Sequence, residues 1–112
     1  MLIVDDEPGF CRLARDRLEA EGLLVVGEAD DVDTALDAVR TLRPDVVVLD
    51  VRLPDGSGVD LTIVVTRSSE PPAMVLTLTA DHAQAALECG ATGFIAKSRL
   101  IGFELRAIIE AT

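Results

Sequence analysis

The stretch Val46-Val47-Val48-Leu49-Asp50 decides the fold of this chain. Four consecutive apolar residues with a carboxylate behind them are typical of a short strand that is covered on both faces of a sheet. A second stretch of the same kind opens the chain, where Met1–Val4 is followed by Asp5 and Asp6. If the two stretches are neighbouring parallel strands, all three carboxylates meet at the carboxyl ends, where open α/β sheets bind their ligands.

Three carboxylates in one place repel one another, so the arrangement predicts a bound cation. Mg²⁺ is the natural candidate because it takes oxygen ligands, keeps several waters and commonly links one or two carboxylates to a phosphoryl group. The sequence therefore predicts a magnesium site built on Asp5, Asp6 and Asp50.

Apolar runs alternate with helical patterns along the chain, and their spacing favours parallel βα units over hairpins. This alternation predicts an α/β fold with one parallel sheet and helices on both of its faces. The expected strands are Leu2–Val4, Leu24–Gly27, Val46–Leu49, Met74–Leu78 and Gly93–Ala96.

Three of the expected helices each show one apolar stripe. The first carries Phe10, Leu13, Ala14 and Leu18 and stops at Gly22; the second is capped by Asp31 or Asp33 and ends before Arg43-Pro44; the last carries Ile101, Leu105, Ile108 and Ile109.

The segment 59–66 has the period of a strand, because apolar Val59, Leu61, Ile63 and Val65 alternate with polar Asp60, Thr62 and Thr66. We nevertheless expect a helix there. A crossover between two parallel strands needs a covering element at this point, and tertiary context often overrides the propensity of β-branched residues. The residues before it, Asp55-Gly56 and Gly58, suit turns.

Composition and charge limit the classes of function that this chain can have. The 112 residues, of which 49% are hydrophobic, suit one domain spanning 1–112. A formal charge of −10 disfavours direct binding of nucleic acid, and no apolar run approaches the roughly 20 residues of a membrane span. Cys11 and Cys89 lack the spacing of metal ligands and are expected to be free thiols. We therefore expect a protein of the reducing cytoplasm.

The motifs at the ends of the expected strands resemble the receiver domain of two-component response regulators along essentially the whole chain. Asp5-Asp6 ends the first strand, and Asp50 ends the third within the stretch Val48-Leu49-Asp50-Val51-Arg52-Leu53-Pro54-Asp55-Gly56. Thr79-Ala80 ends the fourth strand, and the segment 90–97, Gly-Ala-Thr-Gly-Phe-Ile-Ala-Lys, ends the fifth. The resemblance implies a doubly wound, flavodoxin-like sheet with strand order 2-1-3-4-5.

The resemblance also implies roles for the acidic residues. Asp50 is the expected phosphoacceptor, whose carboxylate attacks the phosphorus of a phosphohistidine. Asp6, Asp50 and the main-chain carbonyl of Arg52 are expected to bind Mg²⁺ directly, and Asp5 directly or through water.

Further roles fall on residues of the fourth and fifth strands. Lys97 is expected to pair with one phosphoryl oxygen, while the Thr79 hydroxyl and the Ala80 N–H take the others. Movement of Thr79 toward the phosphoryl group is expected to let Phe94 rotate inward and change the surface that a partner binds.

Two features depart from the family pattern. The interval from Thr79 to Lys97 is short, so the fourth helix, expected over 81–89, is shortened. Ser98 follows Lys97 where the family usually has Pro, so we expect a trans peptide bond there, because a cis bond without Pro costs about 2.5–4 kcal/mol.

The leading hypothesis is a stand-alone phosphorelay signalling domain, not an enzyme, that receives its phosphoryl group from a sensor histidine kinase or phosphotransfer protein. We expect it to be a monomer or weak homodimer that acts on a downstream protein. The alternative is a receiver-like interaction module that works without phosphorylation. A hydrolase with an Asp nucleophile is disfavoured because Arg52 stands two residues after Asp50, and dinucleotide binding because no glycine-rich turn follows the first strand.

Overall fold

The computed structural model describes residues 1–78, 90–99 and 102–110. Its centre is a five-stranded parallel sheet with strand order β2-β1-β3-β6-β7, which confirms the predicted order 2-1-3-4-5. The strands of this sheet are β1 (Leu2–Val4), β2 (Gly27–Ala29), β3 (Val46–Asp50), β6 (Ala73–Leu78) and β7 (Gly93–Ala96).

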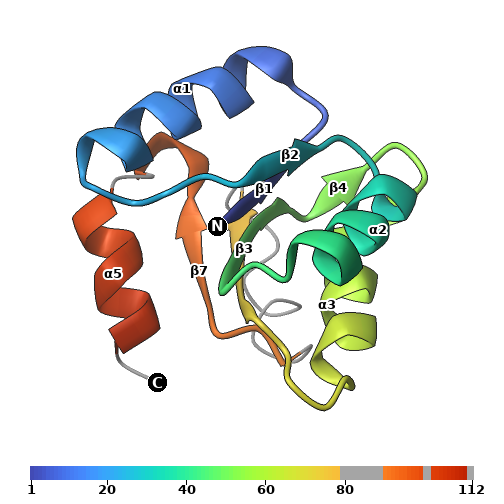
Figure 1. The fold of residues 1–112 in the computed structure, drawn as a ribbon. Coiled ribbons are helices and arrows are strands. Elements are labelled where there is room, and N and C mark those ends of the chain that lie inside the picture. The colour runs from blue at the N-terminus through green and yellow to red at the C-terminus, as the bar shows by residue number, and fades with distance from the viewer. Residues whose placement is uncertain (79–89, 100–101, 111–112) are drawn as a thin grey trace.

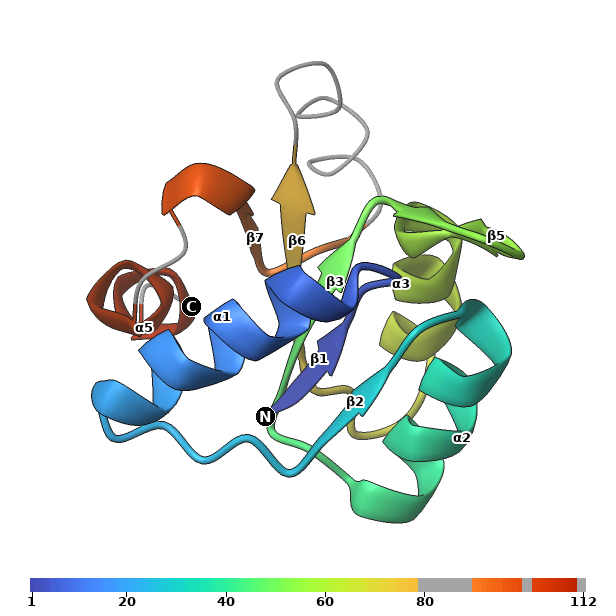
Figure 2. The same cartoon turned by 90° about the horizontal axis from the view of Figure 1, so that it is seen from above.

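Helices cover both faces of the sheet. Figures 1 and 2 place α1 and α5 on one side and α2 and α3 on the other. Their bounds are α1 (Pro8–Ala20), α2 (Val32–Leu42), α3 (Gly58–Thr66) and α5 (Gly102–Glu110), and a short 3-10 helix, η1 (Lys97–Arg99), follows β7. No helix within the described ranges is long and apolar enough to cross a membrane.

The sheet separates two cores, and successive strand residues point into alternate ones. Leu2, Val4 and Leu49 pack on the side of α2 and α3, whereas Ile3 and Val48 pack on the side of α1 and α5. This two-sided burial explains why the central strands are continuous apolar runs.

The second strand begins later than predicted. We expected Leu24–Gly27, but the ladder with β1 starts at Gly27, which pairs with Leu2. The main chain just before it bonds to Met1, whose N-terminal amine donates to Leu24 O at 3.0 Å and whose carbonyl accepts from the Val26 N–H at 2.8 Å. Leu24 is 72% exposed and lies before β2, so its apolar side chain is not evidence of a buried strand residue.

The segment 58–66 is helical, as predicted against its local period. Leu61 and Val65, four residues apart, are buried on the face toward the sheet. The buried Thr62 is satisfied within the helix, because its hydroxyl donates to Gly58 O at 2.7 Å. Tertiary burial therefore decides this element over β-propensity.

A small antiparallel hairpin between β3 and α3 was not predicted. It consists of β4 (Arg52–Leu53) and β5 (Gly56–Ser57), and its turn contains Pro54 and Asp55. Two residues per strand are too few for a periodic pattern to show.

Within the described ranges no peptide bond is cis, so the predicted trans bond between Lys97 and Ser98 is confirmed. Asp31 forms the N-cap of α2 and Cys11 is a buried free thiol, also as predicted. The predicted fourth helix over 81–89, which includes Cys89, lies outside the described residues.

Candidate functional site

The three acidic residues at the strand ends come together. Asp5 follows β1 and Asp50 ends β3, and the register of the two strands, Val4 beside Leu49, sets these carboxylates next to each other. One carboxylate oxygen from each of Asp5, Asp6 and Asp50 lies within 4.8 Å of the others. The parallel pairing of β1 with β3 thus produces the acidic cluster that the sequence predicted.

Lys97 brings a positive charge into this cluster from the end of β7. Its Nζ lies 2.8 Å from Asp5 Oδ2 and 3.0 Å from Asp50 Oδ2, and 3.8 Å from a carboxylate oxygen of Glu7. Phe10 of α1 covers the ammonium with its ring, whose centroid is 4.7 Å away. Burial opposes the charge of Lys97, but the contacts with Asp5 and Asp50 outweigh it and raise the pKa of this lysine above its ordinary value.

Asp5 is the most enclosed acid of the cluster, with 2% of its surface exposed. Burial raises the pKa of Asp5 above its ordinary value, although its contacts with Lys97 and with the Glu7 N–H act in the opposite direction. Its Oδ1 accepts from that N–H at 2.9 Å. Its Oδ2 is buried and lies 2.8 Å from the Lys97 ammonium.

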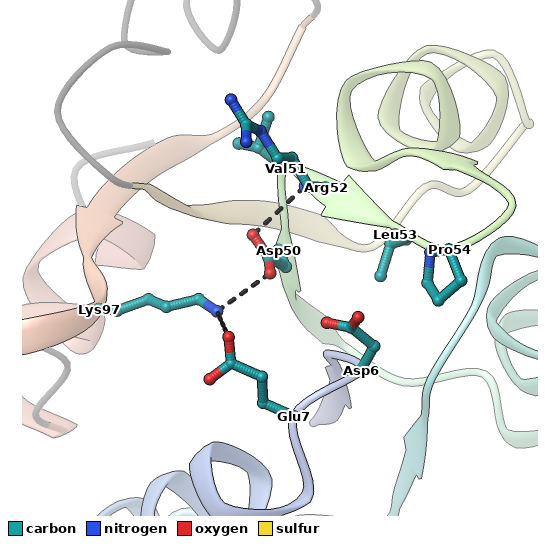
Figure 3. A pocket seen from close by; sticks show the side chains of 8 residues that line it. All are labelled: Asp6, Glu7, Asp50, Val51, Arg52, Leu53, Pro54 and Lys97. Carbon is teal, nitrogen blue, oxygen red and sulfur yellow. Dashed lines mark hydrogen bonds and ion pairs between the residues drawn. The ribbon is translucent and has the colours of Figure 1, made fainter.

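Asp50 lies at the mouth of an open cleft of about 340 Å³. Figure 3 shows Asp50, Asp6, Glu7 and Lys97 around this cleft, with the Arg52 side chain extending away from it. The N–H of Arg52 donates to Asp50 Oδ1 at 3.3 Å, so the main chain of the hairpin helps to orient the carboxylate. A substrate can therefore approach Asp50 from solvent.

The backbone behind Asp50 requires glycine at position 58. A Cβ there would lie 2.0 Å from the Asp50 carbonyl oxygen, far closer than any real contact. The Gly58 N–H also donates to Val51 O at 2.7 Å, which closes the loop after the strand. Gly58, where the sequence suggested a turn, is the first residue of α3, and the close Asp50 carbonyl explains why glycine is needed there.

The predicted phosphoryl-binding and switch residues are Thr79, Ala80 and Phe94. Thr79 and Ala80 lie outside the described residues. Phe94 lies on β7 and is 37% exposed. Thr77 is buried and donates its hydroxyl to Leu49 O at 3.3 Å, which is a contact within the sheet.

Sequence reasoning did not assign Glu7 or Phe10 to the site. Glu7 directly follows Asp5-Asp6, and its position in the turn into α1 was the available signal. Phe10 was assigned to the apolar face of that helix, and periodicity alone cannot show that its ring meets a cation as well.

The cluster suits a magnesium ion. Its donors are carboxylate oxygens, which this cation prefers, and the open cleft leaves room for water ligands. The three carboxylates share the single ammonium of Lys97, so the cluster keeps negative charge that a bound cation would balance. The residues present therefore fit the metal that the sequence predicted.

Comparison with known proteins agrees with this geometry. The sequence-family model of the response regulator receiver domain matches residues 1–110 of this chain. The chain belongs to this family. The receiver domain is 40% identical over 114 residues to the DNA-binding transcriptional activator DevR/DosR of Mycobacterium tuberculosis, covering 98% of this chain and 52% of that protein.

One further relative and one solved structure are similar to this receiver domain. It is 39% identical over 95 residues to a protein-glutamate methylesterase/protein-glutamine glutaminase of Halobacterium salinarum, covering 84% of this chain and 27% of that protein. It superimposes on the signal receiver domain of the putative response regulator NarL from Mycobacterium tuberculosis with a TM-score of 0.81 at 28% identity, covering 96% and 94% of the two chains.

The chain spans about half or less of the length of these two curated relatives. The matched segment is their shared receiver domain, which belongs to two-component response regulators and is consistent with phosphorelay signalling.

Proposed function

We propose that this receiver domain accepts a phosphoryl group on Asp50 from a phosphohistidine of a sensor kinase or phosphotransfer protein. The observation that carries the proposal is the convergence of three carboxylates within 4.8 Å, with Lys97 Nζ in contact with both Asp5 and Asp50. A solvent-accessible nucleophile beside a fixed cation is what phosphoryl transfer needs, since it depends mainly on positioning and charge neutralisation.

In the proposed reaction a carboxylate oxygen of Asp50 attacks phosphorus while the phosphorus–nitrogen bond of the donor breaks. The bonding electron pair remains on the imidazole nitrogen, and the product is an aspartyl phosphate. The attacking group is a carboxylate oxygen, from which no proton has to be removed, so no separate general base is required.

Lys97 has two tasks in this proposal. Before transfer it holds Asp50 Oδ2 at 3.0 Å and so orients the carboxylate. Afterwards it pairs with a phosphoryl oxygen, while its contact with Asp5 keeps the ammonium in place. The buried Asp5 therefore acts as the fixed support of Lys97.

Asp5, Asp6, Asp50 and the main-chain carbonyl of Arg52 are the residues that would hold Mg²⁺. When bound, magnesium supplies the positive charge that neutralises the carboxylates and the incoming phosphoryl oxygens. The contact of Asp50 Oδ1 with the Arg52 N–H supports this assignment, because it brings the Arg52 main chain to the edge of the cleft.

Switching would involve Thr79, Ala80 and Phe94. We assign the Thr79 hydroxyl and the Ala80 N–H to the phosphoryl oxygens, as in the family. The partial exposure of Phe94 supports its role, because an aromatic ring at the surface of β7 can turn inward when space opens beside it. The resulting surface change would alter affinity for a downstream protein.

We further propose that residues 1–112 form one signalling module of the cytoplasm, without an enzymatic activity on other substrates. The family and the site support this proposal, because every residue assigned above serves the phosphoacceptor.

The test is incubation of the chain with acetyl phosphate and Mg²⁺, followed by intact mass. Wild type is expected to gain one phosphoryl group, and Asp50→Asn and an EDTA-treated sample none. Asp37→Asn is a matched control, because Asp37 is an exposed acid in the middle of α2, away from the cleft. Absence of labelling with acetyl phosphate, and again with a kinase donor, would favour the phosphorylation-independent interaction module.

A further inference from the structure

The turn of the β4–β5 hairpin is fastened to the start of α2 by Asp55. One carboxylate oxygen of Asp55 accepts from the Val32 N–H at 2.7 Å, and the other accepts from the Asp33 N–H at 3.3 Å. The two segments are 22 to 23 residues apart in the chain. Figures 1 and 2 show the hairpin beside the first turn of α2.

Packing reinforces this junction. A Cβ built on Gly56 would lie 3.1 Å from a methyl carbon of Val32, so the turn and the helix are already in close contact. Leu53, in the other strand of the hairpin, is buried in the core on the side of α2 and α3. The hairpin is therefore held by the buried side chain of Leu53 and, at its turn, by the hydrogen bonds of Asp55.

The helix alone does not require Asp55. Its N-cap, Asp31, accepts from the Thr34 N–H at 2.8 Å, and the Thr34 hydroxyl completes a capping box. A helix of this kind is already capped by one side chain. Asp55 adds bonds to the two remaining N–H groups of the first turn, and it does so from a different element.

The hairpin matters to the site because its first residue is next to the phosphoacceptor. Arg52 donates its N–H to Asp50 Oδ1, and its carbonyl is the proposed main-chain ligand of the metal. The other end of the loop is closed by the bond from the Gly58 N–H to Val51 O. Movement of the hairpin tip would therefore be felt at both Asp50 and Arg52.

We propose that Asp55 is a positioning residue of the phosphoacceptor site, which holds the Val51–Gly58 loop in its productive place by binding the N-terminus of α2. The part of this inference that concerns metal and phosphoryl transfer rests on the proposed function. The part that concerns the loop stands on the contacts of Asp55 alone.

The test compares Asp55→Ala with Asp31→Ala. Both substitutions remove one acidic side chain from the same helix end, but only Asp55→Ala releases the hairpin. Amide hydrogen exchange of Arg52 and Gly58, measured by NMR without metal, reports on the loop.

We expect Asp55→Ala to raise both exchange rates about fivefold, the population change that the loss of one helix cap produces. Asp31→Ala is expected to leave them within about twofold of wild type, because the cap bonds of Asp31 go to Thr34 within α2 and Asp55 still binds the Val32 and Asp33 N–H groups. Asp55→Asn retains one carbonyl oxygen toward Val32 and is expected to lie between wild type and Asp55→Ala. Equal exchange in the two alanine variants would overturn the proposal.

A second measurement connects the loop to the site. Titration with Mg²⁺, followed by amide chemical shifts, should show about tenfold weaker binding in Asp55→Ala and unchanged binding in Asp31→Ala, in line with the effect of outer-shell partners at metal sites. If wild type binds no Mg²⁺ and accepts no phosphoryl group, the proposed function fails while the exchange result still decides the loop. If wild type does both and the two alanine variants behave alike, only the role of Asp55 fails.

Discussion

Replacement of Lys97 by Met tests how the acidic cluster is stabilised in the absence of metal. The substitution keeps an unbranched side chain of similar length and removes the ammonium. It leaves the buried Asp5 facing Asp50 with no cation between them, since Lys97 Nζ contacts both at 2.8 and 3.0 Å.

The expected loss of stability at neutral pH is about 3 kcal/mol. Breaking a fully buried ion pair costs about 3–5 kcal/mol, because it leaves an uncompensated charge, whereas exposed pairs contribute about 0–1 kcal/mol. The side chain of Asp5 is almost fully enclosed and that of Lys97 is 20% exposed, which places the pair near the lower end of the buried range. The contact with Glu7 adds little, because at 3.8 Å it joins Lys97 to an exposed carboxylate.

The loss should depend on pH. Burial raises the pKa of Asp5, so the native state holds its proton more tightly than the unfolded state, and stability falls as pH rises from the ordinary pKa to the folded one. Removal of Lys97 takes away a contact that lowers this pKa, so the window extends to higher pH. The deficit of the Met variant should therefore be largest above the folded pKa of Asp5 and should shrink as Asp5 is protonated.

The assay is urea unfolding followed by circular dichroism, with EDTA present, from about pH 8 down to about pH 5.5. Arg12→Met is the matched control, since Arg12 is an exposed cation on α1 and its loss should change stability by no more than about 0.5 kcal/mol. A Lys97→Met variant as stable as wild type near pH 8, or one whose deficit does not shrink on acidification, would refute the reasoning.

Three other outcomes are expected. Gly58→Ala should lower the free energy of unfolding by about 3 kcal/mol or prevent folding, because the new Cβ would overlap the Asp50 carbonyl. Gly9→Ala, in open space on α1, should instead raise it by up to about 1 kcal/mol. Urea unfolding of the two variants measures both changes. Burial raises the pKa of the Cys11 thiol to about 11, so this thiol should react with a thiol reagent only as fast as the protein unfolds. The reaction is measured in a Cys89→Ser background, and rapid labelling of the native protein would contradict the burial of Cys11. Mg²⁺ at about one hundred times its dissociation constant should stabilise the fold by about 2.7 kcal/mol, seen as a higher Tm, and an unchanged Tm would contradict the proposed metal site.

The arrangement of the sheet was predictable because its central strands are buried on both faces. A run such as Val46–Leu49 can be satisfied only between two layers of helices, and a carboxylate directly behind it must lie at the edge. By the same logic the sequence predicts that Asp5, Asp6 and Asp50 lie together at this edge. Local patterns therefore predicted the buried strands and the acidic cluster, whereas the order of the strands was predicted from the resemblance to receiver domains.

Local pattern was misleading where a residue's burial depends on distant neighbours. Leu24 has strand character but lies beside Met1 at an edge, outside the ladder that begins at Gly27. The segment 58–66 has the period of a strand, yet it is a helix because the crossover from β3 to β6 must cover the sheet. The first prediction was wrong and the second was confirmed, and in both cases tertiary contact decided the element.

The sequence by itself determined the fold class and the residues of the acidic cluster, since buried parallel strands force polar groups at their ends to one edge of the sheet. Only the tertiary structure decided how these groups are supported. Phe10 over Lys97 and Asp55 at the start of α2 join segments that are far apart in the chain, and no periodicity connects them. Such contacts depend on distance and direction in space, which a linear pattern does not contain.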